Sequence, residues 1–226
     1  MHSPVVPPET LKPSRFIQSD DPAIVAFARA HTGGETDPVK VAINLYFAVR
    51  DGIIYDPYVR FNAPESYSAK DTLAAGRGFC VPKAALLAAC ARAVGIPARL
   101  GFADVRNHLA TPKLLAANGG DIMRWHAFTE MFLDGRWVKS TPAFNLTLCE
   151  RFGVHPLDWD GQTDSVFQPF DTLDRKHMEY VNERGSFADV PIEAIFATFL
   201  EHSPRLLLDD PFAPGSDFAA EAVTSS

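Results

Sequence analysis

One continuous stretch decides the fold: Gly76-Arg-Gly-Phe-Cys80, followed by Val81-Pro-Lys-Ala-Ala-Leu-Leu-Ala-Ala-Cys-Ala-Arg-Ala-Val94. The second part predicts a helix rich in alanine and leucine, and its Pro82 is tolerated in a first helical turn. The glycines before it allow a sharp turn and the close approach of a ligand. Cys80 thus stands at a helix start, where unpaired N–H groups and the helix dipole favour a thiolate. We expect the pKa of this candidate nucleophile to be lowered from its usual value of about 8.5.

Length and composition limit the class of protein. The chain has 226 residues, of which 46% are hydrophobic, enough to bury a core in one large domain or two small ones. No run approaches the roughly 18 apolar residues of a membrane span, and the N-terminus lacks the pattern of a secretory signal. The net charge of −7, without a basic cluster, argues against nucleic acid. We expect a cytoplasmic protein with neither a nucleic-acid nor a membrane partner.

The cysteines support a reducing compartment, because their number, three, is odd and argues against a disulfide framework. Cys90 and Cys149 carry no motif and are expected to be packed core thiols. The spacing of Cys and His residues fits no zinc site, so we expect no metal and no cofactor.

The remaining patterns predict an α+β protein. Expected helices cover residues 23–30, 38–52, 80–94, 111–118 and 191–201, with a single helical turn at 71–76, and expected strands cover 98–105, 124–133 and 136–141. The two last strands alternate with period two around Asp134-Gly135, which is typical of a hairpin turn. We predict a helical N-terminal half whose nucleophile helix packs on an antiparallel sheet. Residues 1–20 are expected to be an extended arm, 21–205 a single domain, and 206–226 a flexible tail.

A thiol nucleophile needs a base, usually an imidazole within hydrogen-bond reach. Among seven histidines, only His126 lies on a well-defined strand, next to Trp125. The others fall in arms, helix ends or loops: His2, His31, His108, His155, His177 and His202. Trp125 suits the wall of a substrate channel as well as it suits the core, and Phe79 beside the thiol is a second candidate for substrate binding. Arg99 and Arg106 fit either a cleft or, better, surface ion pairs.

Several of these motifs together resemble one family, the transglutaminase-like cysteine enzyme superfamily. They are Gly78-Phe-Cys80 with its helix, Arg92-Ala-Val-Gly-Ile-Pro-Ala-Arg99, Trp125-His126-Ala127-Phe128 and Gly135-Arg136-Trp137-Val138. The resemblance covers about residues 70–145, a third of the chain. It implies a papain-like Cys-His-Asp site with Cys80 as nucleophile and His126 as base.

The third member of that site differs from the family pattern. The position of the family aspartate falls on Thr141, and no carboxylate lies between Arg136 and Asn145. A threonine hydroxyl accepts a hydrogen bond from an imidazole N–H but lacks the charge that stabilises imidazolium. Asn145 is the second candidate, since an amide orients the imidazole in papain-like sites.

The expected function is thiol-dependent chemistry at an acyl bond, with a peptide, protein or small amide as substrate. The chain shows no acidic clusters of the calcium-binding type, so a peptidase or amidase is favoured over an amine transferase. The alternative is a weakened or inactive domain that binds peptides or proteins, which the missing aspartate supports. Acyl transfer from a thioester cofactor is a weaker idea, because nothing predicts a nucleotide pocket. The sequence leaves the oligomeric state open.

Overall fold

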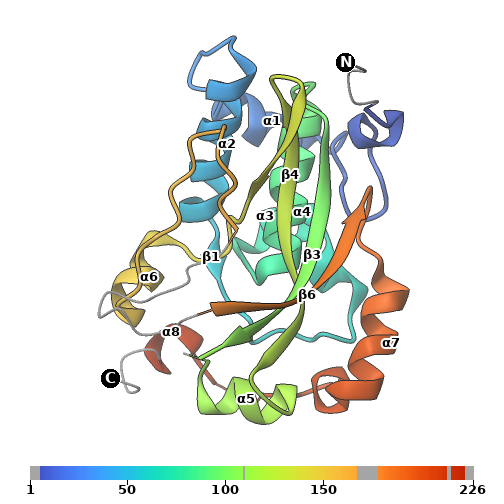
Figure 1. Cartoon of the computed structure of the whole chain (residues 1–226), viewed down its shortest axis with the longest axis vertical. Helices are drawn as coiled ribbons and strands as arrows, with labels where there is room; N and C mark the ends of the chain where they lie inside the picture. Colours follow the sequence, from blue (N-terminus) through green and yellow to red (C-terminus); the bar gives the residue numbers. More distant parts are fainter. Residues whose placement is uncertain (1–5, 109, 167–177, 213–214, 222–226) are drawn as a thin grey trace.

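The computed structural model describes residues 6–108, 110–166, 178–212 and 215–221 (Figure 1). Its helices are α1 (Pro22–Ala30), α2 (Pro38–Gly52), α3 (Ala69–Ala75), α4 (Cys80–Ala93), α5 (Pro112–Asn118), α6 (Leu146–Phe152), α7 (Ile192–His202) and α8 (Phe218–Glu221). Its strands are β1 (Ile54–Tyr55), β2 (Arg77–Gly78), β3 (Ala98–Asn107), β4 (Ile122–Leu133), β5 (Arg136–Ser140) and β6 (Met178–Phe187). Short 3-10 helices cover η1 (Pro8–Leu11), η2 (Pro64–Tyr67) and η3 (Pro204–Leu207). Within the described residues, no helix has the length and apolarity needed to cross a membrane. Helices combined with an antiparallel sheet confirm the predicted α+β class.

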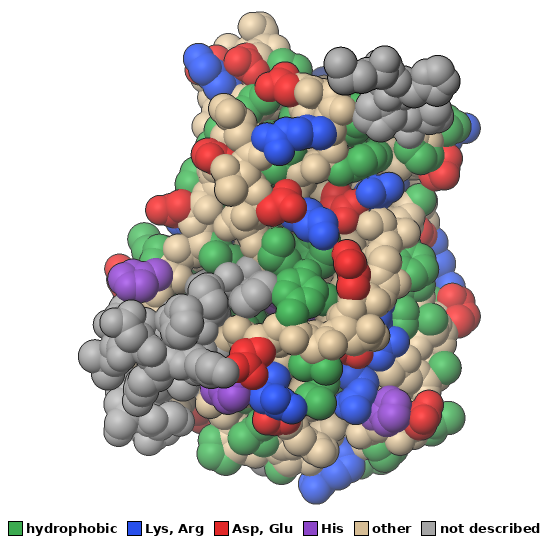
Figure 2. Space-filling view, in the orientation of Figure 1, with side chains coloured by type: hydrophobic (Ala, Val, Ile, Leu, Met, Phe, Trp, Pro, Cys, Tyr) green, Lys and Arg blue, Asp and Glu red, His purple; other side chains and the backbone are tan. Residues whose placement is uncertain are grey.

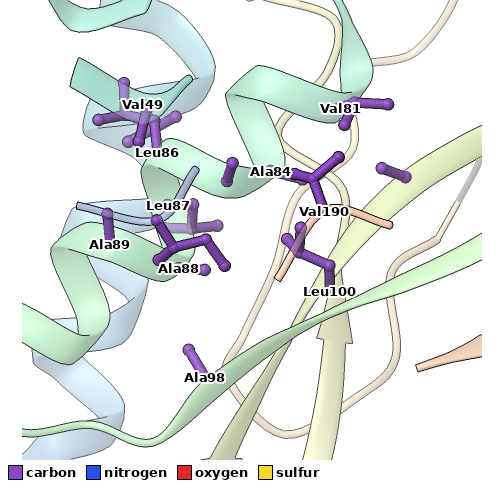
Figure 3. Close-up of a cluster of buried hydrophobic side chains, with 14 of the residues drawn as sticks. Val49, Val81, Ala84, Leu86, Leu87, Ala88, Ala89, Ala98, Leu100 and Val190 are labelled. Carbon is purple, nitrogen blue, oxygen red and sulfur yellow. The ribbon is translucent and has the colours of Figure 1, made fainter. Parts of the chain in front are cut away.

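Helix α4 lies at the centre of the molecule, and every residue from Val81 to Arg92 is buried. One side of the helix packs on β3 and β4, and the other side packs on α1, α2 and α3 (Figure 1). Figure 3 shows Leu86 and the neighbouring alanines of α4 within the same cluster as Val49 of α2 and Leu100 of β3. The many small side chains allow these elements to pack closely around the helix.

Two cationic side chains of α4 are buried in this core and are satisfied by backbone carbonyls. The Lys83 ammonium donates to the carbonyl of Arg50, at 2.9 Å, and to that of Ile53, both at the C-terminal end of α2. The Arg92 guanidinium donates to three carbonyls far apart in the sequence, those of Lys12, Ala98 and Ala188, at 2.7, 2.9 and 2.6 Å. A buried cation without such partners is strongly destabilising, so these bonds hold the helix in one position.

The main sheet has the strand order β5-β4-β3-β6, and each neighbouring pair is antiparallel. The predicted hairpin of β4 and β5 is confirmed. Its turn residues Asp134 and Gly135 have positive φ values of 47° and 82°, as a tight two-residue turn requires. Strand β6 was not expected from the sequence, and it forms the edge of the sheet beside β3.

Both ends of the chain, expected to be an extended arm and a flexible tail, contain residues that pack on the domain. Phe16 and Ile17 of the N-terminal segment belong to the main core. In the C-terminal segment Phe218 is buried, and the Tyr58 hydroxyl donates to Glu221 at 2.6 Å. The described parts of residues 1–20 and 206–226 therefore contribute to the packing of the domain.

Positive and negative side chains are interspersed over the face seen in Figure 2. Arg99 of β3 pairs with Glu130 of β4, and its guanidinium lies 4.1 Å from the ring centre of Trp137. Arg106 pairs with Asp121 at 3.1 Å. Arg99 and Arg106 therefore form ion pairs, which the sequence favoured over a role in lining a cleft.

Replacing Gly101 by alanine should destabilise the sheet. A Cβ at this position would lie 2.0 Å from the ring of Phe128, which faces it across the β3–β4 pair and is buried. We expect the free energy of unfolding to fall by about 1–3 kcal/mol, the usual cost of overpacking, as measured by urea denaturation. Gly52→Ala is the matched control, since a Cβ there meets nothing within 4 Å. Equal stability of both variants would contradict the close contact.

Candidate active site

Cys80 is the first residue of α4, and no side chain caps the start of this helix. The backbone N–H groups of Cys80 and Val81 interact with the sulfur instead. Glycines make the approach to the helix possible. Gly76 ends α3 with a φ of 65°, and a Cβ on Gly78 would lie only 3.0 Å from the Thr72 side chain. The chain thus passes tightly between α3 and α4 to present the thiol.

His126 lies on β4, next to an irregularity in the sheet. The preceding residue, Trp125, has a φ of 60°, and the pairing register between β3 and β4 shifts at this point. The following residue, Ala127, presents its backbone N–H to the sulfur of Cys80. Strand β4 pairs with β5 only from Thr129 to Leu133. The thiol of Cys80 therefore contacts β4 just before this paired segment. Cys80 and His126 consequently line the same cavity.

The environment of Cys80 is less favourable to a thiolate than the sequence predicts. Burial raises the pKa of Cys80 to about 11 and outweighs the three backbone N–H groups that act in the opposite direction. The expected lowering of this pKa is therefore wrong, because the surrounding side chains exclude the water that would solvate the charge. Solvent still reaches part of Cys80, whereas Cys90 and Cys149 are buried, as predicted for core thiols, and burial raises the pKa of each to about 12.

The cavity beside Cys80 is narrow and largely apolar. Its volume is about 60 Å³, which is room for only a few water molecules. Six aromatic residues line it: Tyr55, Phe61, Phe79, Trp125, Phe144 and Phe199. Phe79 and Trp125 are both buried residues of the main core, so each serves packing and the cavity wall at once. Within the described ranges, no group of three or more His, Cys, Asp or Glu residues is arranged to hold a metal ion.

A charged pair on neighbouring strands holds Trp125 in its positive-φ conformation. Asp104 of β3 accepts a hydrogen bond from the backbone N–H of Trp125 at 3.1 Å. Arg184 of β6 donates to both oxygens of this carboxylate at 2.6 and 2.9 Å, and its guanidinium lies 4.5 Å from the Trp125 ring centre. A positive φ is costly for a bulky residue and persists only when surrounding contacts impose it. The sequence did not point to either charged residue, because β6 was not predicted and Asp104 belongs to no recognisable motif.

Both candidates for orienting His126 make hydrogen bonds to other groups. The Thr141 hydroxyl donates to the carbonyl of Val166 at 2.5 Å, which leaves the lone pairs of its oxygen as acceptors. The Asn145 amide is occupied on both sides: its oxygen accepts from the Tyr55 N–H at 2.9 Å, and its nitrogen donates to Thr147 at 2.7 Å. Thr141 remains the better candidate, and its role remains a prediction.

Iodoacetamide should modify Cys80 slowly at pH 7 and faster as the pH rises, because only the thiolate reacts. With a pKa of about 11, only about one thiol in 10⁴ is ionised at pH 7. The rate is measured by mass spectrometry of the Cys80 peptide, with the peptide of buried Cys90 as internal control. A plateau in the rate below pH 7 that His126→Ala removes would instead establish a thiolate–imidazolium pair.

Arg184→Met should destabilise the protein and disturb Trp125. The change leaves the buried Asp104 carboxylate without its ion-pair partner, which costs about 3–5 kcal/mol in comparable cases. Fluorine NMR of the fluorotryptophan-labelled protein, which contains three tryptophans, should show a shifted or broadened Trp125 signal. Arg106→Met, which breaks an exposed ion pair, is the control and should cost about 1 kcal/mol or less. An unchanged Trp125 signal in Arg184→Met would show that the Asp104–Arg184 ion pair does not maintain the positive φ of Trp125.

Similarity to known proteins indicates the family of this chain. No curated protein matches the chain. A solved structure described as a "putative cysteine protease" from Cytophaga hutchinsonii is similar, with 20% sequence identity and a TM-score of 0.45. The similarity covers 79% of this chain and 53% of that one, so this chain spans about half the length of that protein. The sequence model of the transglutaminase-like superfamily matches residues 25–142, more than half of the chain and a range that includes Cys80 and His126. The chain belongs to the transglutaminase-like superfamily.

Proposed function

We propose that this protein is a thiol-dependent hydrolase of amide or related acyl bonds, with Cys80 as nucleophile and His126 as general base. One observation carries the proposal. Cys80 and His126 line the same cavity, and three backbone N–H groups, those of Cys80, Val81 and Ala127, surround the sulfur. A nucleophile, a base and hydrogen-bond donors for a developing oxyanion are the parts that acyl transfer needs.

The raised pKa of Cys80 determines how the reaction begins. The resting thiol is neutral, so His126 takes the proton from sulfur while the sulfur attacks the substrate carbonyl. The backbone N–H groups stabilise the negative oxygen of the tetrahedral intermediate. The C–N bond then breaks, the imidazolium protonates the leaving amine, and a thioester remains on Cys80. Water attacks this thioester with His126 again acting as base, which releases the carboxylic acid and restores the thiol.

Three further residues complete the proposed site. Thr141 is the proposed acceptor for the imidazole N–H, and its neutral hydroxyl stabilises the imidazolium less than a carboxylate would. Phe79 and Trp125 are proposed to contact the substrate, because both lie in the cavity wall. Phe79 is the residue directly before the nucleophile, and Trp125 is directly before the base. The proposed reaction uses side chains, backbone N–H groups and water, and it involves no cofactor.

A second candidate function is peptide or amide binding without catalysis. It is favoured by the neutral state of the Cys80 thiol, whose pKa is about 11, and by the hydroxyl in place of a carboxylate at Thr141. In this case the cavity and fold would serve recognition, and the thiol would be a lining group.

An acyl-enzyme assay should distinguish the two functions. Incubation with p-nitrophenyl esters and fluorogenic amides should give turnover and a mass increase on the Cys80 peptide. Cys80→Ala should abolish both, and His126→Ala should lower kcat by about 10²–10⁴-fold. Matched controls are Cys90→Ala, which removes a core thiol, and His155→Ala, which removes an exposed imidazole. Turnover that survives Cys80→Ala would disprove the proposed mechanism, and ligand binding without any adduct would support the binding function.

A further inference from the structure

Arg124 is the one arginine or lysine that lines the described cavity beside Cys80. It lies on β4, two residues before His126, and is half-buried. Arg124 makes no hydrogen bond or ion pair with any residue that the structure describes. A guanidinium has five N–H donors, so this position offers unused donors at the wall of an apolar cavity.

One other polar side chain of the same wall, that of Asn118, already has hydrogen-bond partners. The Asn118 amide donates to the carbonyls of Gly120 and Ile122 at 2.8 and 2.9 Å, and it accepts from the Ser203 hydroxyl at 3.2 Å. Other shielded arginines also have partners. Arg184 pairs with Asp104, and Arg50 and Arg99 pair with carboxylates. The contrast indicates that the donors of Arg124 are kept for a ligand.

The chemistry of the cavity restricts that ligand. A guanidinium binds a carboxylate through two parallel hydrogen bonds, and the bond is stronger where water is excluded. The aromatic walls suit an aryl or alkyl group. A narrow apolar site favours a carboxylate over a more strongly hydrated phosphate dianion. Arg124 and His126 line the same cavity, so an anion bound to Arg124 and a carbonyl near His126 would belong to one small ligand.

We propose that the cavity recognises amides that combine an apolar group with a free carboxylate, and that Arg124 binds this carboxylate. The proposal rests on the proposed function, because it places the scissile carbonyl at Cys80 and the carboxylate on the next side chain of the wall. Arg124 then determines specificity. With a net charge of −7 the protein as a whole repels anions, so selection for one would depend on this local cation.

The test uses binding, so it does not depend on turnover. Phenylacetate and its neutral analogue phenylacetamide are titrated by NMR into the full-length Cys80→Ala variant. We expect phenylacetate to bind about tenfold more tightly or better, the usual effect of a hydrogen bond to a charged group. Arg124→Gln should remove this preference, and Arg124→Lys should retain part of it. Arg29→Gln is the control, since it removes an equal charge from an exposed helical position and should keep the preference.

Several results would overturn the proposal. They are equal affinity for the two probes, failure of both to bind at millimolar concentration, and a preference that persists in a folded Arg124→Gln variant. In each case the acyl-enzyme assay at Cys80 remains a separate test of the proposed hydrolase. Conversely, a carboxylate preference that depends on Arg124, without any Cys80 adduct, would retain the ligand site and remove the catalytic function.

Discussion

The burial of α4 on all sides is the constraint on which the rest of the structure depends. A helix enclosed by a sheet and three helices has no exposed face for its charged residues, so Lys83 and Arg92 must find backbone carbonyls inside the core. These bonds and the close packing of its alanines hold the helix in place. Because Cys80 is the first residue of α4, the position of the thiol follows from the position of the helix.

The candidate site forms where the start of α4 meets the bulged part of β4. Ala127 and His126 reach this point because Trp125 adopts a positive φ, and Asp104 with Arg184 maintains it. The enclosure that positions the thiol also raises its pKa. A site built in this way relies on a nearby base during attack, whereas a solvated helix start would hold a preformed thiolate.

The sequence predicted the features that depend on local patterns. The nucleophile helix, the strand after Gly95-Ile96-Pro97 and the hairpin at Asp134-Gly135 all have such signals, and the family resemblance drew on them. Strand β6 was missed because its residues lack clear alternation and its pairing with β3 is long-range. The pKa of Cys80 was predicted in the wrong direction, since the sequence indicates a helix dipole but does not show which aromatic rings enclose the sulfur. The unpaired state of Arg124 likewise depends on three-dimensional neighbours.

The contacts of Arg92 have a consequence for where the chain can be shortened. This single guanidinium joins the carbonyl of Lys12, near the N-terminus, to that of Ala188, near the last long helix. The region matched by the superfamily, residues 25–142, contains neither carbonyl. A fragment limited to residues 25–142 would leave the buried Arg92 guanidinium without two of its hydrogen-bond acceptors. The smallest unit that folds independently is therefore larger than the region matched by the superfamily.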